Sequence, residues 1–221
     1  MIKDRLQSLV NELPSDVKLV AVSKFHPVSR LMEAYDAGQR VFGENRPQEL
    51  AAKVPQMPAD VEWHFIGHLQ TNKLKLVLPY VSLVQSVDSF HLLEAIDNWG
   101  SANGKVVDIL LELHLGAEET KHGFSEEDIM SILHVEVPTS THCYRIRGLM
   151  GMATNTENEG VIEADFARIE ALFRWIRAEH PALADTFTEL SIGMSGDWPI
   201  AVRHGATMVR IGTDIFGARE Y

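Results

Sequence analysis

Short apolar runs alternate with amphipathic stretches eight times along this chain, and this alternation constrains the fold more than any other feature. No linker rich in Pro, Gly or Ser interrupts the pattern, so we expect a single domain over residues 1–221. Eight strands alternating with helices in this length fit an α/β fold of the (β/α)₈ TIM barrel type better than an open, doubly wound sheet. The predicted strands are Leu19–Lys24, Val41–Glu44, Trp63–Ile66, Leu83–Val87, Val107–Leu115, Arg145–Met150, Glu189–Ile192 and Thr207–Ile211.

The segments between these runs carry signals of helix ends. An extra helix, roughly Ile2 to Leu13, is predicted before the first strand. Ser29 is expected to cap a helix that stops at Gly38, and Asp88 to cap an amphipathic run through Ile96.

The second half of the chain has two further helix signals. Residues Ser125 to Asp128 have the form of a capping box. The longest predicted helix has apolar residues at alternating steps of four and three before Pro181 closes it. Its apolar face consists of Ile162, Phe166, Ile169, Phe173 and Ile176.

The charge balance limits the partners of the chain. Lys and Arg number 20 against 31 Asp and Glu, a net charge of −11, which argues against nucleic acid or an anionic membrane as the main partner. The single cysteine, Cys143, excludes an intrachain disulfide and is typical of a reducing cytoplasm. The N-terminal residues are charged and helix-like, so we expect neither a signal peptide nor a membrane span. We therefore expect a cytoplasmic protein, and a monomer, because no exposed apolar stripe indicates an obligate dimer.

The first predicted strand ends on a lysine. Lys24 follows Val20 and Val22 at steps of two, so it is predicted to share their face of the strand. Burial of an unpaired ammonium is expensive, so this amine either has an anionic partner or takes part in covalent chemistry. On this stretch alone, a lysine in solvent at the end of a strand remains the simpler alternative.

Glycine-rich turns follow the last two predicted strands. In barrels of this kind these two loops often bind phosphate through small residues and a helix N-terminus. Ser195 with Gly196, and Gly212 with Thr213, provide that chemistry. The alternatives are a helix cap by Ser195 for residues 197–204 and an ordinary strand-to-helix turn at Gly212 and Thr213.

Arg210 alternates with Val209 and Ile211, and it points into the barrel mouth if those two face the helices. A buried guanidinium needs an acceptor, and a salt bridge to Glu44 is the alternative to a ligand. A strand-end lysine, a phosphate site and an interior cation together indicate pyridoxal 5′-phosphate (PLP), with Lys24 forming the Schiff base. An arginine at the pyridine nitrogen disfavours a protonated ring, which weakens the ring as an electron sink.

Other reactive residue types are less informative. His64 and His68 have the spacing of metal ligands on a helix, but they lie in a predicted strand and its turn, so we expect no metal site there. Met150 and Met152 are expected to pack the barrel, although a methionine can also contact a cofactor ring. Cys143 precedes a predicted strand with no obvious base nearby, so it is not expected to be a nucleophile.

The chain resembles the pyridoxal phosphate homeostasis proteins (the YggS/PROSC family) from Lys18 to Gly217. The motifs that carry this resemblance are Ala21-Val22-Ser23-Lys24, Phe42-Gly43-Glu44-Asn45, Trp63-His64-Phe65-Ile66-Gly67-His68-Leu69-Gln70-Thr71-Asn72-Lys73, Gly148-Leu149-Met150, Leu190-Ser191-Ile192-Gly193-Met194-Ser195-Gly196-Asp197 and Val209-Arg210-Ile211-Gly212-Thr213. It implies a barrel like the N-terminal domain of alanine racemase, with PLP on Lys24. It further implies Asn45 and Met150 near the ring, Ser195, Gly212 and Thr213 at the phosphate, and Arg210 at the pyridine nitrogen. Asp214 departs from the small residue common in the family, and an acid there would repel a phosphate unless its side chain turns outward.

Two classes of function follow from this resemblance. The first is a non-catalytic PLP carrier or sensor in PLP homeostasis, with PLP-dependent apo-enzymes as possible partners; the second is a PLP-dependent amino-acid racemase. Racemisation needs a second base on the opposite face of the substrate, and the racemase takes a tyrosine from a second domain. We expect that domain to be absent, because the chain ends at Tyr221, and no motif marks a tyrosine as that base. The tyrosines are Tyr35, Tyr80, Tyr144 and Tyr221. A Schiff-base aldolase without PLP is a weaker alternative, because it leaves Arg210 unexplained.

Overall fold

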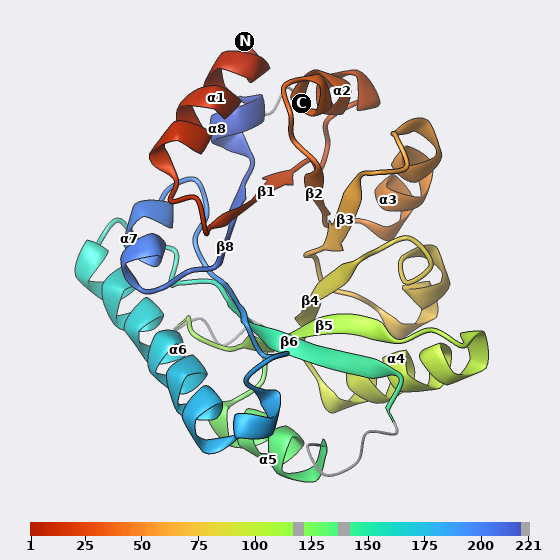
Figure 1. Ribbon diagram of the computed structural model, residues 1–221, viewed down its shortest axis with the longest axis vertical. Helices are drawn as coiled ribbons and strands as arrows, with labels where there is room; N and C mark the ends of the chain where they lie inside the picture. The colour runs from red at the N-terminus through yellow and green to blue at the C-terminus, as the bar shows by residue number, and fades with distance from the viewer. Residues whose placement is uncertain (117–121, 137–141, 218–221) are drawn as a thin grey trace.

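The computed structural model describes residues 1–116, 122–136 and 142–217, and in it eight parallel strands close into a barrel in the order of the sequence (Figure 1). The predicted barrel is confirmed, and the open sheet is excluded by the pairing of β1 with β8, in which Val20 lies opposite Arg210. The strands are β1 (Lys18–Val22), β2 (Val41–Glu44), β3 (Glu62–Phe65), β4 (Leu83–Val87), β5 (Val107–Leu113), β6 (Tyr144–Gly151), β7 (Glu189–Ser191) and β8 (Met208–Ile211).

Helices lie outside the strand ring and alternate with the strands (Figure 1). The predicted extra helix is present as α1, which packs on α2 and α8 and thereby covers the seam where the barrel closes. The connection from β3 to β4 carries the 3₁₀-helix η2 instead of an α-helix. The helices are α1 (Ile2–Glu12), α2 (Val28–Asp36), α3 (Pro47–Lys53), η1 (Val54–Gln56), η2 (Thr71–Leu76), α4 (Phe90–Asn103), α5 (Glu126–Glu136), α6 (Glu159–Glu179), η3 (Pro181–Leu183), α7 (Trp198–Arg203) and α8 (Thr213–Phe216).

Two predicted caps are wrong. The helix α2 begins at Val28, and the residue at its N-cap is Pro27, whose fixed φ and missing N–H suit a helix start, so Ser29 lies inside the first turn. The helix α4 is capped by Ser89, whose hydroxyl accepts a hydrogen bond from the Leu92 N–H, and not by Asp88. The Asp88 carboxylate is instead engaged by a histidine from the neighbouring strand end, which competes with capping.

The capping box at the start of α5 is confirmed. The Ser125 hydroxyl accepts a hydrogen bond from the Asp128 N–H, and the Asp128 carboxylate accepts one from the Ser125 N–H. The predicted apolar face of α6 is also confirmed, since all five of its residues are buried against the sheet.

Apolar side chains form two separate layers. The larger layer lies between the strands and the surrounding helices. The smaller layer lies inside the barrel and consists of Val20, Leu83, Leu110, Met150 and Met208. Five residues do not fill that interior, and the remaining space is taken by buried polar side chains that lead to the strand ends.

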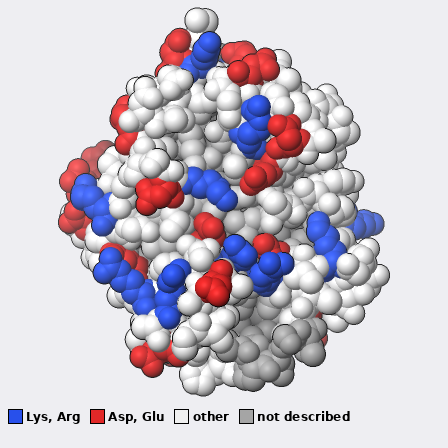
Figure 2. Space-filling model, in the orientation of Figure 1, with Lys and Arg blue, Asp and Glu red and all other residues white. Residues whose placement is uncertain are grey.

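Among the described residues, no helix combines the length and the apolar character needed to cross a membrane. On the face of the molecule shown in Figure 2, acidic and basic side chains are interspersed and neither sign dominates. This distribution agrees with the negative net charge in giving no basic surface on that face for a polyanion.

Candidate functional site

The lysine at the end of β1 lies in a turn and not in the strand. β1 ends at Val22, and although the Ser23 N–H still donates to the Gly43 carbonyl, the chain then turns with the His26 N–H bonded to the Ser23 carbonyl. Lys24 is half-buried in this turn. The predicted strand therefore ended two residues too late, because the apolar run gives no sign of where strand pairing ends.

A buried network, which we call the Lys24 clamp, holds the backbone on both sides of Lys24. The Lys53 ammonium donates to the Ser23 carbonyl at 2.9 Å, to Glu44 Oε1 at 2.6 Å and to Glu49 Oε2 at 3.1 Å. The Ser23 hydroxyl also donates to Glu44 Oε1, and the Phe25 N–H donates to Glu49 Oε2 at 2.8 Å. Phe25 has a φ of 67°, a left-handed conformation that costs free energy and persists only where neighbouring contacts enforce it.

The two carboxyl groups of the clamp have pKa values that are shifted in opposite directions. Glu44 is fully buried, and that burial raises the pKa of its carboxyl while Lys53 and the Ser23 hydroxyl oppose the shift. The pKa of Glu49 is lowered by hydrogen bonds from the Phe25 N–H and Lys53, which outweigh its burial. Two carboxyl groups thus share one buried amine, and the hydrogen bonds among them hold the network in one arrangement.

Strand register brings the predicted glycine turn next to the lysine turn. Ala21 on β1 lies opposite Ile211 on β8, so the residues that follow each strand emerge side by side. A Cβ on Gly212 would lie 3.2 Å from the Val22 carbonyl oxygen, so glycine allows the two backbones this approach. Thr213 is exposed and begins α8.

Ser195 follows β7, and its hydroxyl interacts with the Asp214 carboxylate on α8. Burial raises the pKa of Asp214, and the bond from Ser195 opposes that shift. Ser195 is not the cap of α7, because Asp197 occupies that position. The acidic residue thus turns toward the very serine that was predicted to bind phosphate.

Asn45 and Met150 lie on two other strands of the same rim. Asn45 directly follows β2, and its side-chain oxygen is buried without a hydrogen-bond partner among the described residues. Met150 is buried in β6 opposite Ser191 of β7 and belongs to the inner layer. The seven predicted site residues therefore come from β1, β2, β6, β7 and β8 and lie at, or next to, the carboxyl ends of those strands.

Arg210 is buried inside the barrel near its carboxyl end, as predicted. Its guanidinium donates to the Ser191 carbonyl at 2.7 Å, to the Ser191 hydroxyl at 2.6 Å and to the Gly151 carbonyl at 2.9 Å. The predicted alternative, a salt bridge to Glu44, is wrong because Glu44 is bound by Lys53. Burial lowers the pKa of Arg210 to about 10, and the charges of Glu112 and Asp197 oppose this shift, so the guanidinium is protonated at neutral pH.

A chain of hydrogen bonds runs from Arg210 through the barrel interior. The Ser191 hydroxyl donates to Gln85 Oε1 at 2.7 Å, and Gln85 Nε2 lies 2.8 Å from His64 Nδ1. Because a guanidinium can only donate, every bond in the chain has one direction, and His64 must accept at Nδ1 and carry its proton on Nε2. Burial, with a smaller contribution from the charge of Lys18, lowers the pKa of His64 to about 3, consistent with a neutral ring.

Glu112 on β5 is a second buried titratable group at this rim. Its burial and the charge of Asp88 raise its pKa to about 7, against the influence of Arg210. The sequence analysis missed Glu112, Lys53, Gln85 and His64 as members of the site. A single polar residue inside an apolar strand, such as Glu112 or Gln85, is the only local signal that could have indicated them.

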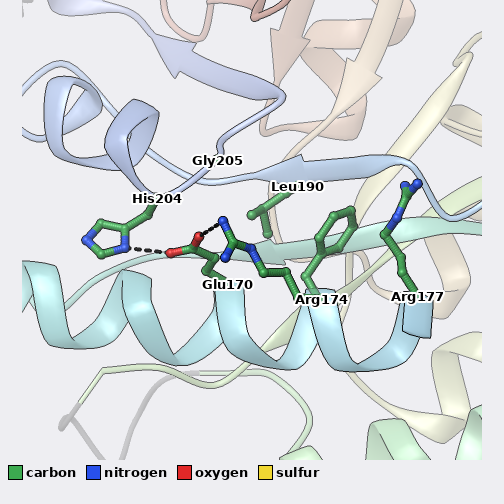
Figure 3. A pocket seen from close by; sticks show the side chains of 7 residues that line it. Glu170, Arg174, Arg177, Leu190, His204 and Gly205 are labelled. Carbon is green, nitrogen blue, oxygen red and sulfur yellow. Dashed lines mark hydrogen bonds and ion pairs between the residues drawn. The ribbon is translucent and has the colours of Figure 1, made fainter. Parts of the chain in front are cut away.

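Two cavities differ in their relation to this rim. One of about 320 Å³ adjoins it and is lined by the turn after β6 and by Met194, Gly196 and Asp197 after β7. The other, of about 330 Å³, lies between α6 and the segment from α7 to β8 (Figure 3). There the Glu170 carboxylate lies 2.8 Å from His204 Nδ1 and 2.6 Å from the Arg174 guanidinium, and the Arg177 guanidinium donates to the Phe187 carbonyl. None of the seven predicted residues lines that second cavity.

Comparisons with known proteins agree with one another. The family model described as alanine racemase, N-terminal domain, matches residues 1–220. A protein of Haemophilus influenzae named pyridoxal phosphate homeostasis protein is 36% identical over 215 residues, which are 96% of this chain and 89% of that protein. A protein of Schizosaccharomyces pombe with the same name is 34% identical over 222 residues, covering 99% and 90% of the two chains.

Solved structures show the same likeness. PipY of Synechococcus elongatus PCC7942 is 38% identical, with 98% of this chain and 100% of PipY covered. The TM-score is 0.91 for PipY without PLP and 0.89 for PipY with PLP bound. An alanine racemase of Clostridium difficile 630, 12% identical with a TM-score of 0.76, shares the fold over 57% of its length.

The neutral state of His64 predicts how stability depends on pH. The folded protein excludes a proton that the unfolded chain takes up below about pH 6.5, so stability is fully present above that pH and is lost as the pH falls toward 3. His64→Asn keeps an acceptor for Gln85 but removes the titration. Between about pH 7 and pH 4.5, we expect denaturant unfolding to show the wild type losing roughly 3 kcal/mol more than this variant.

His134→Asn is the matched control, since His134 is exposed on α5, and it should follow the wild type. Parallel pH profiles for the wild type and His64→Asn would contradict the neutral, buried His64.

Proposed function

Because the chain belongs to the family of pyridoxal phosphate homeostasis proteins, which have the fold of the alanine racemase N-terminal domain, we propose that it binds PLP and takes part in intracellular PLP homeostasis. The observation that carries the proposal is the arrangement of an amine, an interior guanidinium and two small-residue turns around one rim of the barrel. PipY, with which this chain shares 38% of its residues, has been solved with PLP bound.

The residues present fit this cofactor. The Asn45 oxygen is a buried acceptor without a partner among the described residues, the kind of group that a bound ligand satisfies. Gly212 has no side chain, so its backbone is accessible to a ligand at a point where a Cβ would come into tight contact with Val22. Lys24, Asn45, Met150, Ser195, Arg210, Gly212 and Thr213 are the residues that we propose to hold PLP.

Lys24 would provide the covalent attachment. The Lys24 amine would hold PLP covalently through the aldehyde carbon of the cofactor, with the aldehyde oxygen lost as water. The Lys24 clamp supports this role, because hydrogen bonds to Ser23 and Phe25 fix the backbone on each side of the lysine. A fixed backbone lowers the entropy lost when the side chain is tethered.

Arg210 is proposed to donate to the pyridine nitrogen. Its fixed positive charge disfavours protonation of that nitrogen, and bound PLP then supplies only a weak electron sink. The chain through Ser191, Gln85 and His64 supports this role by holding the guanidinium in one orientation.

The tyrosines favour a carrier over a racemase. Tyr35 lies in the last turn of α2, Tyr80 precedes β4 and Tyr144 begins β6, so all three lie toward the amino ends of the strands, opposite the proposed site. Tyr221 lies outside the described residues. We therefore propose a cytoplasmic, monomeric and non-catalytic PLP protein, with PLP-dependent apo-enzymes as its possible partners.

Replacement of Lys24 tests the attachment. Purified wild type should be yellow, and borohydride should fix the cofactor to the peptide that contains Lys24. Lys24→Ala should lose this adduct but keep weaker, phosphate-anchored binding of PLP. Lys18→Ala, at the other end of β1, is the matched control and should keep the adduct. A reducible adduct in Lys24→Ala would show that another amine holds the cofactor, and wild type that ignores added PLP would overturn the function.

Exchange of the α-proton separates carrier from racemase. A racemase must remove and replace the α-proton of its substrate, whereas a carrier need not. Incubated with α-deuterated amino acids, the loaded protein should release deuterium no faster than an equal concentration of free PLP. Exchange that is fast, and is lost in Lys24→Ala, would instead support the enzyme.

Asp214 is expected to weaken phosphate binding. Its carboxylate engages the Ser195 hydroxyl and places a negative charge beside the proposed phosphate site. Asp214→Asn removes that charge, so PLP should bind several-fold more tightly, with the gain shrinking at high salt. Asp16→Asn, an exposed change before β1, should leave PLP affinity unchanged. Equal affinities of wild type and Asp214→Asn, measured by fluorescence titration, would remove Asp214 and Ser195 from the phosphate site.

A further inference from the structure

Three side chains with metal-ligand chemistry meet at the same end of the barrel, on the side formed by β3, β4 and β5. They are His68, Asp88 and His122, and their nearest ligand atoms all lie within 4.8 Å of one another. His68 Nδ1 is 2.8 Å from Asp88 Oδ2, and His122 Nδ1 is 3.8 Å from the same oxygen. The two imidazole rings are stacked, with centroids 4.1 Å apart and planes 17° apart. Two imidazoles thus present the same nitrogen to one carboxylate oxygen.

The backbone holds each of the three in place. Asp88 directly follows β4, and the Ser86 hydroxyl donates to the Gly67 carbonyl, which anchors the turn before His68. After His122 the chain returns to β5, since the Phe124 N–H donates to the Glu112 carbonyl and its carbonyl accepts from the His114 N–H. His68 and Asp88 therefore follow two neighbouring strands, and His122 lies where the chain returns beside the third.

We propose that His68, Asp88 and His122 bind one divalent transition-metal ion of the Zn²⁺ class. Two imidazole nitrogens and a carboxylate oxygen form a ligand set typical of Zn²⁺ sites that keep an open position, and they select against Mg²⁺ and Ca²⁺, which prefer oxygen alone. The site uses none of the residues proposed to bind PLP, and it stands independently of that function.

The geometry is close to that of a bound ion. In a tetrahedral zinc site with ligand bonds near 2.1 Å, neighbouring ligand atoms are roughly 3.4 Å apart. The two nitrogen-to-oxygen distances, 2.8 and 3.8 Å, lie on either side of this value, and all three ligand atoms lie within 4.8 Å of one another, so shifts of about an ångström or less would complete the site.

The carboxylate of the proposed metal site is buried, whereas the two imidazoles are exposed. The Asp88 side chain is 4% exposed, whereas those of His68 and His122 are 46% and 61% exposed. A buried carboxylate attracts a cation strongly because little water screens it. Because the two histidines are exposed, an ion can reach the site from solvent. Its fourth coordination position can then be occupied by water or by a small ligand.

Metal titration of the untagged, PLP-free chain in a buffer without phosphate tests the site. Competition with a chromogenic chelator should show one Zn²⁺ per chain, bound with roughly micromolar affinity or tighter. Co²⁺ should bind with the same stoichiometry and give the strong visible absorption of four- or five-coordinate cobalt.

Ligand variants identify the residues. Because replacement of an outer partner of a metal ligand costs 10- to 100-fold, His68→Ala and His122→Ala should each weaken Zn²⁺ binding at least about tenfold. His122→Asp keeps a ligand and should recover part of the affinity. His134→Ala removes an exposed histidine on α5 and should bind as wild type does.

His122 is mostly exposed, so its variants should fold normally, and matching thermal unfolding curves without metal would establish this. Absence of stoichiometric binding in the wild type, or full affinity in His122→Ala, would overturn the site. Loss of affinity confined to the two ligand variants supports it, whatever the outcome of the PLP experiments.

Discussion

Burial of one guanidinium inside the barrel governs the arrangement around it. Arg210 has only donors, and removing its charge from water is tolerable only where acceptors surround it. The protein meets this requirement mainly with neutral oxygens, namely two carbonyls and the Ser191 hydroxyl. That hydroxyl must then donate elsewhere, and Gln85 and His64 follow as a consequence. The buried polar side chains inside the barrel thus form one hydrogen-bonded chain that starts at Arg210. Because each hydrogen bond in the chain has a fixed direction, the guanidinium is held in one orientation.

A second buried basic side chain, that of Lys53, hydrogen-bonds to the protein backbone. Lys53 joins Glu44 and Glu49, and through them it secures the turn that contains Lys24, including the left-handed Phe25. Such a conformation costs on the order of 1 kcal/mol or more, which the charged network offsets. Arg210 and Lys53 therefore have comparable roles on opposite sides of β1. The hydrogen bonds of Arg210 hold its guanidinium inside the barrel, and those of Lys53 hold the backbone of the turn that contains Lys24. The proposed cofactor would meet groups that are already positioned.

Most of the fold was predictable, because each strand of a covered barrel is a short apolar run with its own local signal. β2 and β4 have the predicted bounds, and Arg210 points inward as its alternation with Val209 and Ile211 indicated. The wrong predictions concern side chains whose partners are far away in the sequence. Asp88 does not cap α4 because His68 takes its carboxylate, and the partner of Glu44 is Lys53 on α3 and not Arg210. Gln85 and His64 look like ordinary strand residues until the closed barrel places them beside Ser191.

The same rigidity bears on why a carrier is the better interpretation. Catalysis on PLP draws electrons into the ring and moves protons on both faces of the substrate. A fixed guanidinium at the ring nitrogen would oppose the first requirement. The described tyrosines lie toward the opposite end of the barrel, so in these residues nothing of that type meets the second. Tight positioning of Lys24 and Arg210 does, however, favour retention of the cofactor, since little entropy is lost when it binds. With PLP bound as proposed, the Asp214 charge would weaken binding at the phosphate, and this would ease release of the cofactor.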